Sequence, residues 1–222
     1  TIYHQGSIYQ ATAPTVPFLA EILEGAPTPC KVHALELLSL ISMGCGWHQA
    51  HKEYSILASR RDTPEFQTAL KNEEVWVAEV ASAVRRHHPL YLQLLTAPSR
   101  DVRMQAATLI AGLNHEPPAG LDRMESAYRA EPDVVVRACY ARAMGELAAG
   151  APRLQALLSF ESAPLPRLAL ALRILATSAP EEAIEVVSAA MISGEILPSY
   201  HELPNVLDFY GDLALGLLAA AP

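Results

Sequence analysis

The sequence predicts an all-α fold, a right-handed α-solenoid (an α-α superhelix) of helical hairpins with about 10–13 helices in total. Three observations predict it. Half of the 222 residues are apolar but only 6% are aromatic, a mixture that suits close-packed helices better than sheets. Seventeen prolines favour many short helices over a few long ones. A helical pattern also repeats along the chain, as expected of stacked hairpins.

The clearest repeat lies in the middle of the chain. Residues 98–113 ("PSRDVRMQAATLIAGL") match residues 132–147 ("PDVVVRACYARAMGEL") at an offset of 34 residues. The alignment places Ser99 on Asp133. Both residues are good helix N-caps, because their side-chain oxygens accept the free amide hydrogens of the first turn. In the second copy, Val136 and Met144 are expected to face inward.

Two further segments carry apolar residues at the same spacings of three and four. These are residues 28–42, with Thr28 as the expected cap, and residues 162–176, with Ser162 as the expected cap. Each of the four long helices is preceded by a shorter apolar helix, so that each pair forms a hairpin. The shorter helices are expected at residues 16–23, 89–95, 121–128 and 154–160.

The "DxxVR" start and the "VRACYARAMGEL" body resemble HEAT repeats of the bacterial short-turn type. The opening "YHQGSIYQATAPTVPFLAEIL" and the later "TPEFQ" at residues 63–67 resemble a bacterial, actinobacterial-type group of HEAT-repeat proteins. The resemblance implies a HEAT-like solenoid with a general role in binding, and it implies no catalytic residues. It also implies that Arg103 and Arg137 bond neighbouring turns. The matching positions are Val136, Arg137, Ala141, Ala143, Gly145 and Leu147.

We expect one HEAT-repeat solenoid over residues 1–222, with a non-repeat insertion loop at 44–62 and a divergent acidic cap at 181–222. The insertion is much longer than a turn between helices requires, and such excursions often serve function. After it, Thr63 is expected to cap a helix that opens at Pro64 and runs to about Arg86. The chain begins with Thr rather than Met, so the sequence leaves open whether a segment precedes it.

The insertion supplies the first group of candidate partner-binding residues: Trp47, His48, His51 and Tyr54. Aromatic and imidazole side chains on a loop are typical anchors of protein interfaces. Two alternatives stay open. Trp47 could fold back to fill the gap where the repeat is interrupted, or the two histidines, one helical turn apart, could bind a metal. The second alternative lacks further ligands, so we expect neither a metal nor a cofactor.

The second group consists of polar positions on one face of the longer helices, which would line a concave surface. Glu36 and Arg142 occupy equivalent positions, so the surface would run from acidic to basic and suit a charged peptide or protein. Cys139 is expected to lie outward beside Arg142. Ordinary solvated helix faces carry similar residues. The candidates are His33, Glu36, Glu79, Gln105, Arg142, Glu146 and Arg173.

Charge is segregated along the chain. The net charge is −8, with −4 in residues 1–84, +3 in 85–173 and −7 in 174–222, where there is no Lys or Arg. This balance argues against a general nucleic-acid binder. The longest apolar runs are about half of the ~20 residues that cross a bilayer, so no membrane association is expected. Three cysteines without zinc or redox spacing favour a reduced, cytoplasmic protein, and we expect a monomer.

These features favour a non-enzymatic module that binds a protein or peptide through the concave face and the 44–62 loop. The sequence does not decide between an immunity-like, toxin-neutralising role and an assembly role. The alternative is a nucleic-acid enzyme resembling the HEAT-like alkylpurine DNA glycosylases, which would require Arg85, Arg103, Arg142 and Arg173 to converge beside Trp76. A HEAT-type lyase acting on a tetrapyrrole–protein adduct or another small molecule is a third option, with no reactive group to support it.

Overall fold

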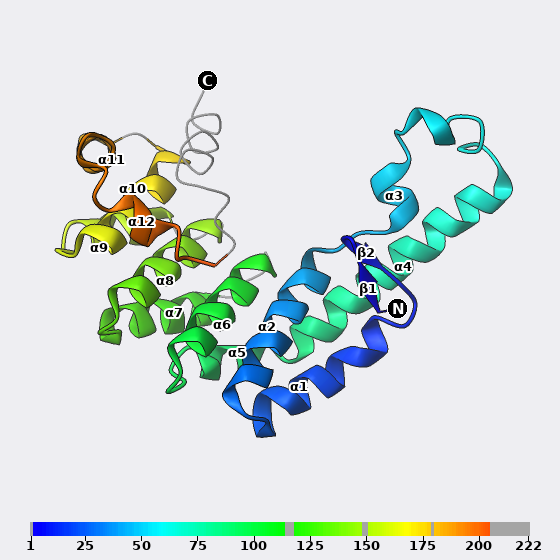
Figure 1. Ribbon diagram of the computed structural model, residues 1–222, viewed down its shortest axis with the longest axis horizontal. Coiled ribbons are helices and arrows are strands. Elements are labelled where there is room, and N and C mark those ends of the chain that lie inside the picture. Colours follow the sequence, from blue (N-terminus) through cyan, green and yellow to red (C-terminus); the bar gives the residue numbers. More distant parts are fainter. Residues whose placement is uncertain (1, 114–117, 148–150, 179, 205–222) are drawn as a thin grey trace. The chain divides into compact units, whose positions relative to one another are not determined.

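The computed structural model describes residues 2–113, 118–147, 151–178 and 180–204 (Figure 1). These residues are mostly helical, which confirms the all-α class, and they include one two-stranded sheet. The chain divides into two compact units, with the boundary in the sequence between Tyr91 and Leu92. Each unit is described by itself. None of the described helices is long and apolar enough to cross a membrane.

The first unit begins with a hairpin of β1 (Tyr3–His4) and β2 (Ser7–Ile8), which pair antiparallel. Its two-residue turn places Gln5 at φ 48° and Gly6 at φ 82°, a backbone conformation that glycine adopts readily. Strands of two residues leave no periodic pattern in a sequence, which is why helical spacing did not predict this sheet. Ile8 donates its backbone N–H to the Cys45 carbonyl over 2.9 Å and thereby ties the hairpin to the start of the insertion.

The helices of the first unit pack around leucine and valine side chains. The pair α1 and α2 forms the expected hairpin, and α4 packs on both of them and on α3. Fully buried residues include Leu23, Leu35, Leu38 and Val84. The helices are η1 (Ala13–Thr15), α1 (Val16–Gly25), α2 (Thr28–Met43), α3 (Trp47–His51), η2 (Ser55–Leu57) and α4 (Pro64–Arg86).

Two cap predictions in this unit have different outcomes. Thr63 caps α4 by accepting the Phe66 N–H at 3.3 Å, and the helix opens at Pro64 and ends at Arg86, as predicted. Thr28 is wrong as a cap, because the N-cap is Pro27 and no side chain bonds the first turn. A proline at the N-cap brings an extended backbone that starts a helix without a side-chain acceptor.

The helices of the second unit pack in sequence order. The long helix α8 packs against α6 on one side and α10 on the other, with α7 and α9 also against it, and α11 packs on α10. Val136 and Met144 are fully buried in α8, as predicted. The helices are α6 (Arg100–Gly112), α7 (Pro118–Ala130), α8 (Val134–Glu146), α9 (Ala151–Leu158), α10 (Pro164–Leu175), α11 (Glu181–Ser193) and α12 (Leu197–Tyr200); α5 (His88–Leu94) crosses the boundary between the units.

Three cap predictions fall in the second unit. Ser99 accepts the Val102 N–H at 3.5 Å, and Asp133 accepts those of Val135 and Val136 at 2.8 and 3.2 Å, so both are confirmed. Ser162 is wrong, because the N-cap of α10 is Ala163 and it makes no side-chain cap bond. Part of the predicted acidic cap, residues 205–222, lies outside the described residues.

Candidate functional site

The insertion at residues 44–62 is held to α4 by one buried carboxylate. Glu73 of α4 is 5% exposed. Its two oxygens accept the backbone N–H of His48 at 2.9 and 3.1 Å and that of Gln49 at 3.2 Å. These amides belong to the first turn of α3 and have no partner inside that short helix, so Glu73 serves as its cap. A Cβ at Gly46 would collide with the same carboxylate, which explains the glycine there.

The aromatic side chains of α3 and Tyr54, which follows that helix, form a cluster of rings in contact. The Trp47 and His51 rings stack at 4.8 Å with an interplanar angle of 23°. His48 meets the edge of Trp47 at 5.0 Å, and Tyr54 meets the edge of His51 at 4.9 Å. Trp47 is nevertheless 41% exposed and Tyr54 58% exposed. Trp47 therefore does not fill a gap in the helix packing, and the insertion presents two aromatic rings at the surface.

The imidazoles of the cluster have fixed orientations. His48 Nδ1 lies 2.7 Å from Glu73 Oε1, and His51 Nδ1 lies 2.7 Å from the Trp47 carbonyl oxygen. An ionised carboxylate and a carbonyl only accept hydrogen bonds, so in each neutral ring Nδ1 carries the proton and Nε2 is the acceptor. Within the described ranges, no group of three His, Cys, Asp or Glu residues is arranged to hold a metal ion.

A small hollow of about 230 Å³ opens beside Trp47 and His48. Phe66 of α4 forms part of its wall and meets the His48 ring edge-on at 5.0 Å. Arg60 and Glu65 add charged groups of opposite sign to the wall. The hollow is too small for a typical cofactor site, which occupies about 300–1,000 Å³, but it suits one side chain of a partner.

The other predicted residues of the first unit are polar groups on helix faces, with His33 and Glu79 exposed and Glu36 partly buried. His33 and Glu36 of α2 pair with each other at 3.1 Å, one turn apart. Glu79 of α4 is exposed and lines a second hollow in the same unit, which also contains Val75 and Arg86. These positions resemble ordinary solvated helix faces, the alternative to a partner-binding concave surface.

In the second unit, three predicted residues join in one polar chain. Glu146 Oε1 lies 3.1 Å from an Arg173 nitrogen and 3.8 Å from an Arg142 nitrogen. Arg142 is only 7% exposed, and it also donates to the Pro204 carbonyl oxygen at 2.9 Å. The expectation that Arg142 projects outward to a partner is therefore wrong, because the turn after α12 covers it.

Cys139 was also expected to lie outward, and it is buried. Its Sγ lies 3.5 Å from the Met104 carbonyl oxygen and 3.8 Å from the Thr108 hydroxyl, in the contact between α6 and α8. Burial raises the pKa of the Cys139 thiol to about 11. Gln105, a predicted partner-binding residue on α6, is half-buried. The face of α8 that carries Cys139 is therefore a packing face.

A series of arginines explains the repeated Arg103 and Arg137. Arg103 binds Glu131 at 2.7 Å and also donates to the carbonyl oxygens of residues 97 and 98. Arg137 binds Glu161 at 3.1 Å and donates to the carbonyl oxygens of residues 131 and 132. The expected bonds to neighbouring turns are thus present. The two glutamates were not predicted, although each lies one residue before the start of a predicted repeat, at residues 132 and 162.

The geometry of the second unit bears on the DNA glycosylase alternative. Arg103 lies in the first turn of α6, where Glu131 neutralises it, whereas Arg142 lies in the last turns of α8 and is buried. Both guanidinium groups are thus engaged with groups of the same unit, and the alternative itself stays a prediction.

Comparison with known proteins adds no family. No protein-family model matches the chain, and a search of curated proteins finds no significant match. The resemblance to HEAT repeats stays a prediction. The features that indicate a function are therefore the exposed aromatic cluster of the insertion and the packing of the second unit.

Proposed function

We propose that this chain is a non-enzymatic binding module that recognises a protein or peptide partner. The exposed aromatic cluster of the insertion (Trp47, His48, His51 and Tyr54) would be the anchor. The helices of the second unit would form a right-handed, HEAT-like α-solenoid that serves as a rigid frame. That the array extends through the first unit stays a prediction.

Repeated local chemistry supports the solenoid. In each of two successive turns, an arginine of the long helix bonds the carbonyl oxygens five and six residues before it and a glutamate of the next repeat. Arg167 of α10 continues the series by donating to the Glu161 carbonyl oxygen and to Glu182, both at 3.3 Å. Contacts of this kind between one repeat and the next are expected of a solenoid.

The exposure of Trp47 and Tyr54 in fixed orientations is the observation that carries the binding proposal. A surface aromatic ring that is already ordered loses little conformational entropy when a partner covers it, so more of the burial energy appears as affinity. Trp47 leaves about two fifths of its surface exposed. For a side chain of about 250 Å², that is about 100 Å², or about 2.5 kcal/mol if a partner buries it completely. This magnitude is that of an interface hot spot.

The neighbouring groups indicate what the partner offers. The hollow beside Trp47 suits one apolar or mixed side chain, and the Nε2 atoms of His48 and His51 accept hydrogen bonds in the neutral rings. A partner would combine an inserted side chain with hydrogen-bond donors around it. Polypeptides supply both at close spacing, which favours a protein or peptide over a polyanion.

Capture on immobilised protein tests the proposal. Wild-type protein and a Trp47→Ala, Tyr54→Ala variant are each exposed to lysate of the source cells, and retained proteins are identified by mass spectrometry. The matched control is Phe18→Ala, which removes an aromatic ring that is 65% exposed and belongs to α1 of the same unit.

We expect a protein that wild type and the Phe18→Ala control retain and that the double variant loses. Purified, that protein should bind the double variant at least about 30-fold more weakly than wild type, corresponding to about 2 kcal/mol. Equal retention by all three would move the binding surface away from the insertion. Retention of nucleic acid alone would contradict the proposed class of partner.

A further inference from the structure

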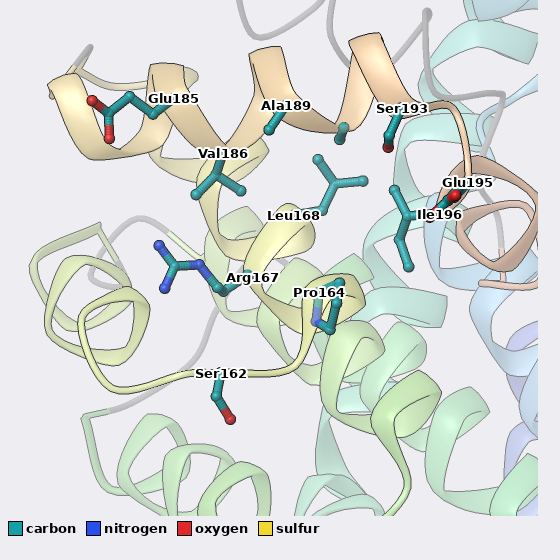
Figure 2. A pocket seen from close by; sticks show the side chains of 11 residues that line it. Ser162, Pro164, Arg167, Leu168, Glu185, Val186, Ala189, Ser193, Glu195 and Ile196 are labelled. Carbon is teal, nitrogen blue, oxygen red and sulfur yellow. The ribbon is translucent and has the colours of Figure 1, made fainter.

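A second surface, separate from the aromatic cluster, lies between α10 and α11. A groove of about 740 Å³ separates the first turns of α10 from the second half of α11. Figure 2 shows Leu168 of α10 and Val186 and Ala189 of α11 facing each other across it, with Ile196 at one end. Its volume lies in the range of sites that bind a ligand, and most of its lining is apolar.

The ends of the groove carry acidic groups. Glu185 lies at one end and Glu195 at the other, and both are exposed (Figure 2). Arg167 also borders the groove, but its guanidinium lies 3.3 Å from Glu182, which offsets its charge. Residues 174–204 contain five acids and no Lys or Arg. An apolar groove therefore lies in a region of negative potential.

The dimensions of the groove fit a helix. Its α11 wall extends from Glu185 to Ser193, a rise of about 12 Å, or about two helical turns. Earlier in this unit each long helix lies beside the next, α6 on α8 and α8 on α10. Among the described residues, the helix that follows α11 is α12, which has only four residues.

We propose that this groove binds a basic amphipathic helix of a partner protein. The apolar stripe of that helix would cover Val186 and Ala189, and Lys or Arg residues beside the stripe would lie near Glu185 and Glu195. Apolar burial would provide most of the affinity, while the opposite charges would accelerate association and exclude acidic helices. The groove shares no residue with the insertion, so this proposal does not depend on the one above.

Fluorescence anisotropy with synthetic peptides tests the proposal on the full chain. The probe is a labelled peptide of roughly 14 residues, with Leu and Ala in a helical stripe and Lys on its flanks. One comparison peptide has Glu in place of each Lys, and another has the same composition in an order without a stripe. We expect saturable binding of the basic amphipathic peptide, weakened by salt, and at least about tenfold weaker binding of both comparison peptides.

Two matched pairs of variants locate the binding. Ala189→Trp fills the groove and should weaken binding at least about tenfold, whereas Ser188→Trp, an exposed neighbour outside the groove, should change it less than about twofold. Glu185→Lys should weaken binding about fivefold. Glu181→Lys makes the same change in net charge on the same helix and should weaken binding less than about twofold.

Other outcomes overturn the proposal. Equal binding to wild type and Ala189→Trp would place the peptide elsewhere, and equal binding of the acidic peptide would exclude charge recognition. Absence of binding to folded wild type would show that the groove does not accept such a helix. If wild type sediments as a dimer that Ala189→Trp dissociates, the occupant is a second copy of this chain. A Trp47→Ala variant that still binds the peptide keeps this test separate from that of the insertion.

Discussion

Replacing Glu161 by Gln tests the arginine–glutamate series that joins successive repeats of the second unit. Glu161 Oε2 accepts from Tyr128 OH at 2.6 Å and from Arg137 Nε at 3.1 Å, while Oε1 accepts from the Ala163 N–H at 2.9 Å. Gln has nearly the same shape, but its NH₂ group must replace one of these oxygens. At least one buried donor then faces another donor.

The expected loss follows from that mismatch. Hydrogen bonds to a charged acceptor contribute about 1.5–3 kcal/mol each, and an unsatisfied buried donor adds a further penalty, so Glu161→Gln should reduce the free energy of unfolding by about 2–4 kcal/mol. For a chain of this size, the midpoint of thermal unfolding should fall by about 5–15 °C. The measurement is urea unfolding followed by circular dichroism at pH 7. Glu181→Gln, at an exposed position on α11, is the control and should change stability by less than about 0.5 kcal/mol.

The pH dependence distinguishes the charge from the shape of the side chain. Burial acts to raise the pKa of Glu161, but hydrogen bonds from Tyr128, Ala163 and Arg137 outweigh it and hold the pKa below its ordinary value. A carboxyl group with a lowered pKa stabilises the fold fully above about pH 4.3 and loses that contribution as the pH falls through the lowered pKa. The difference between wild type and Glu161→Gln should therefore be full at pH 7 and shrink below about pH 4. A difference that is the same at pH 7 and below pH 4, or absent at pH 7, would show that the charge of Glu161 does not stabilise the fold.

Three further predictions concern single positions. Gly145→Ala should destabilise the protein by about 1–3 kcal/mol in urea unfolding, because the new Cβ would lie 2.5 Å from a side chain of α10. Gly25→Ala is the control and should cause no such steric destabilisation, because nothing lies within 4 Å of its new Cβ. Cys30 is exposed and should react with a thiol reagent in the native state, whereas Cys139, buried and with its pKa raised to about 11, should react only on unfolding. Glu73→Ala should release α3 and shift tryptophan emission to the red at neutral pH, and an unchanged spectrum would show that Glu73 does not hold the insertion.

The helices could be predicted because their signals are local. Ser99, Asp133 and Thr63 are each followed by apolar residues at helical spacing, and each caps a helix in the structure. Thr28 and Ser162 have the same residue types, yet each lies one residue away from the true cap. Cap residues thus predict that a helix is present more reliably than they predict which residue begins it.

The candidate site depended on contacts that no local pattern contains. Glu73 lies 25 residues from His48, so its role as the cap of α3 could not be seen from sequence spacing. Arg142 was placed on the exposed face by its repeat position, and the chain 62 residues later covers it. Trp47 was identified because an interruption of the repeat is itself a local signal, whereas its exposure became visible only in the structure.

Hydrogen–deuterium exchange of the full chain, with and without the captured partner, shows which residues the partner covers. We expect the bound partner to slow exchange of the amides in residues 47–57. The Trp47→Ala, Tyr54→Ala variant should lose this protection, and Phe18→Ala should keep it. Protection confined to other segments, or protection of residues 47–57 that the double variant retains, would contradict the claim that the aromatic cluster of the insertion is the binding anchor.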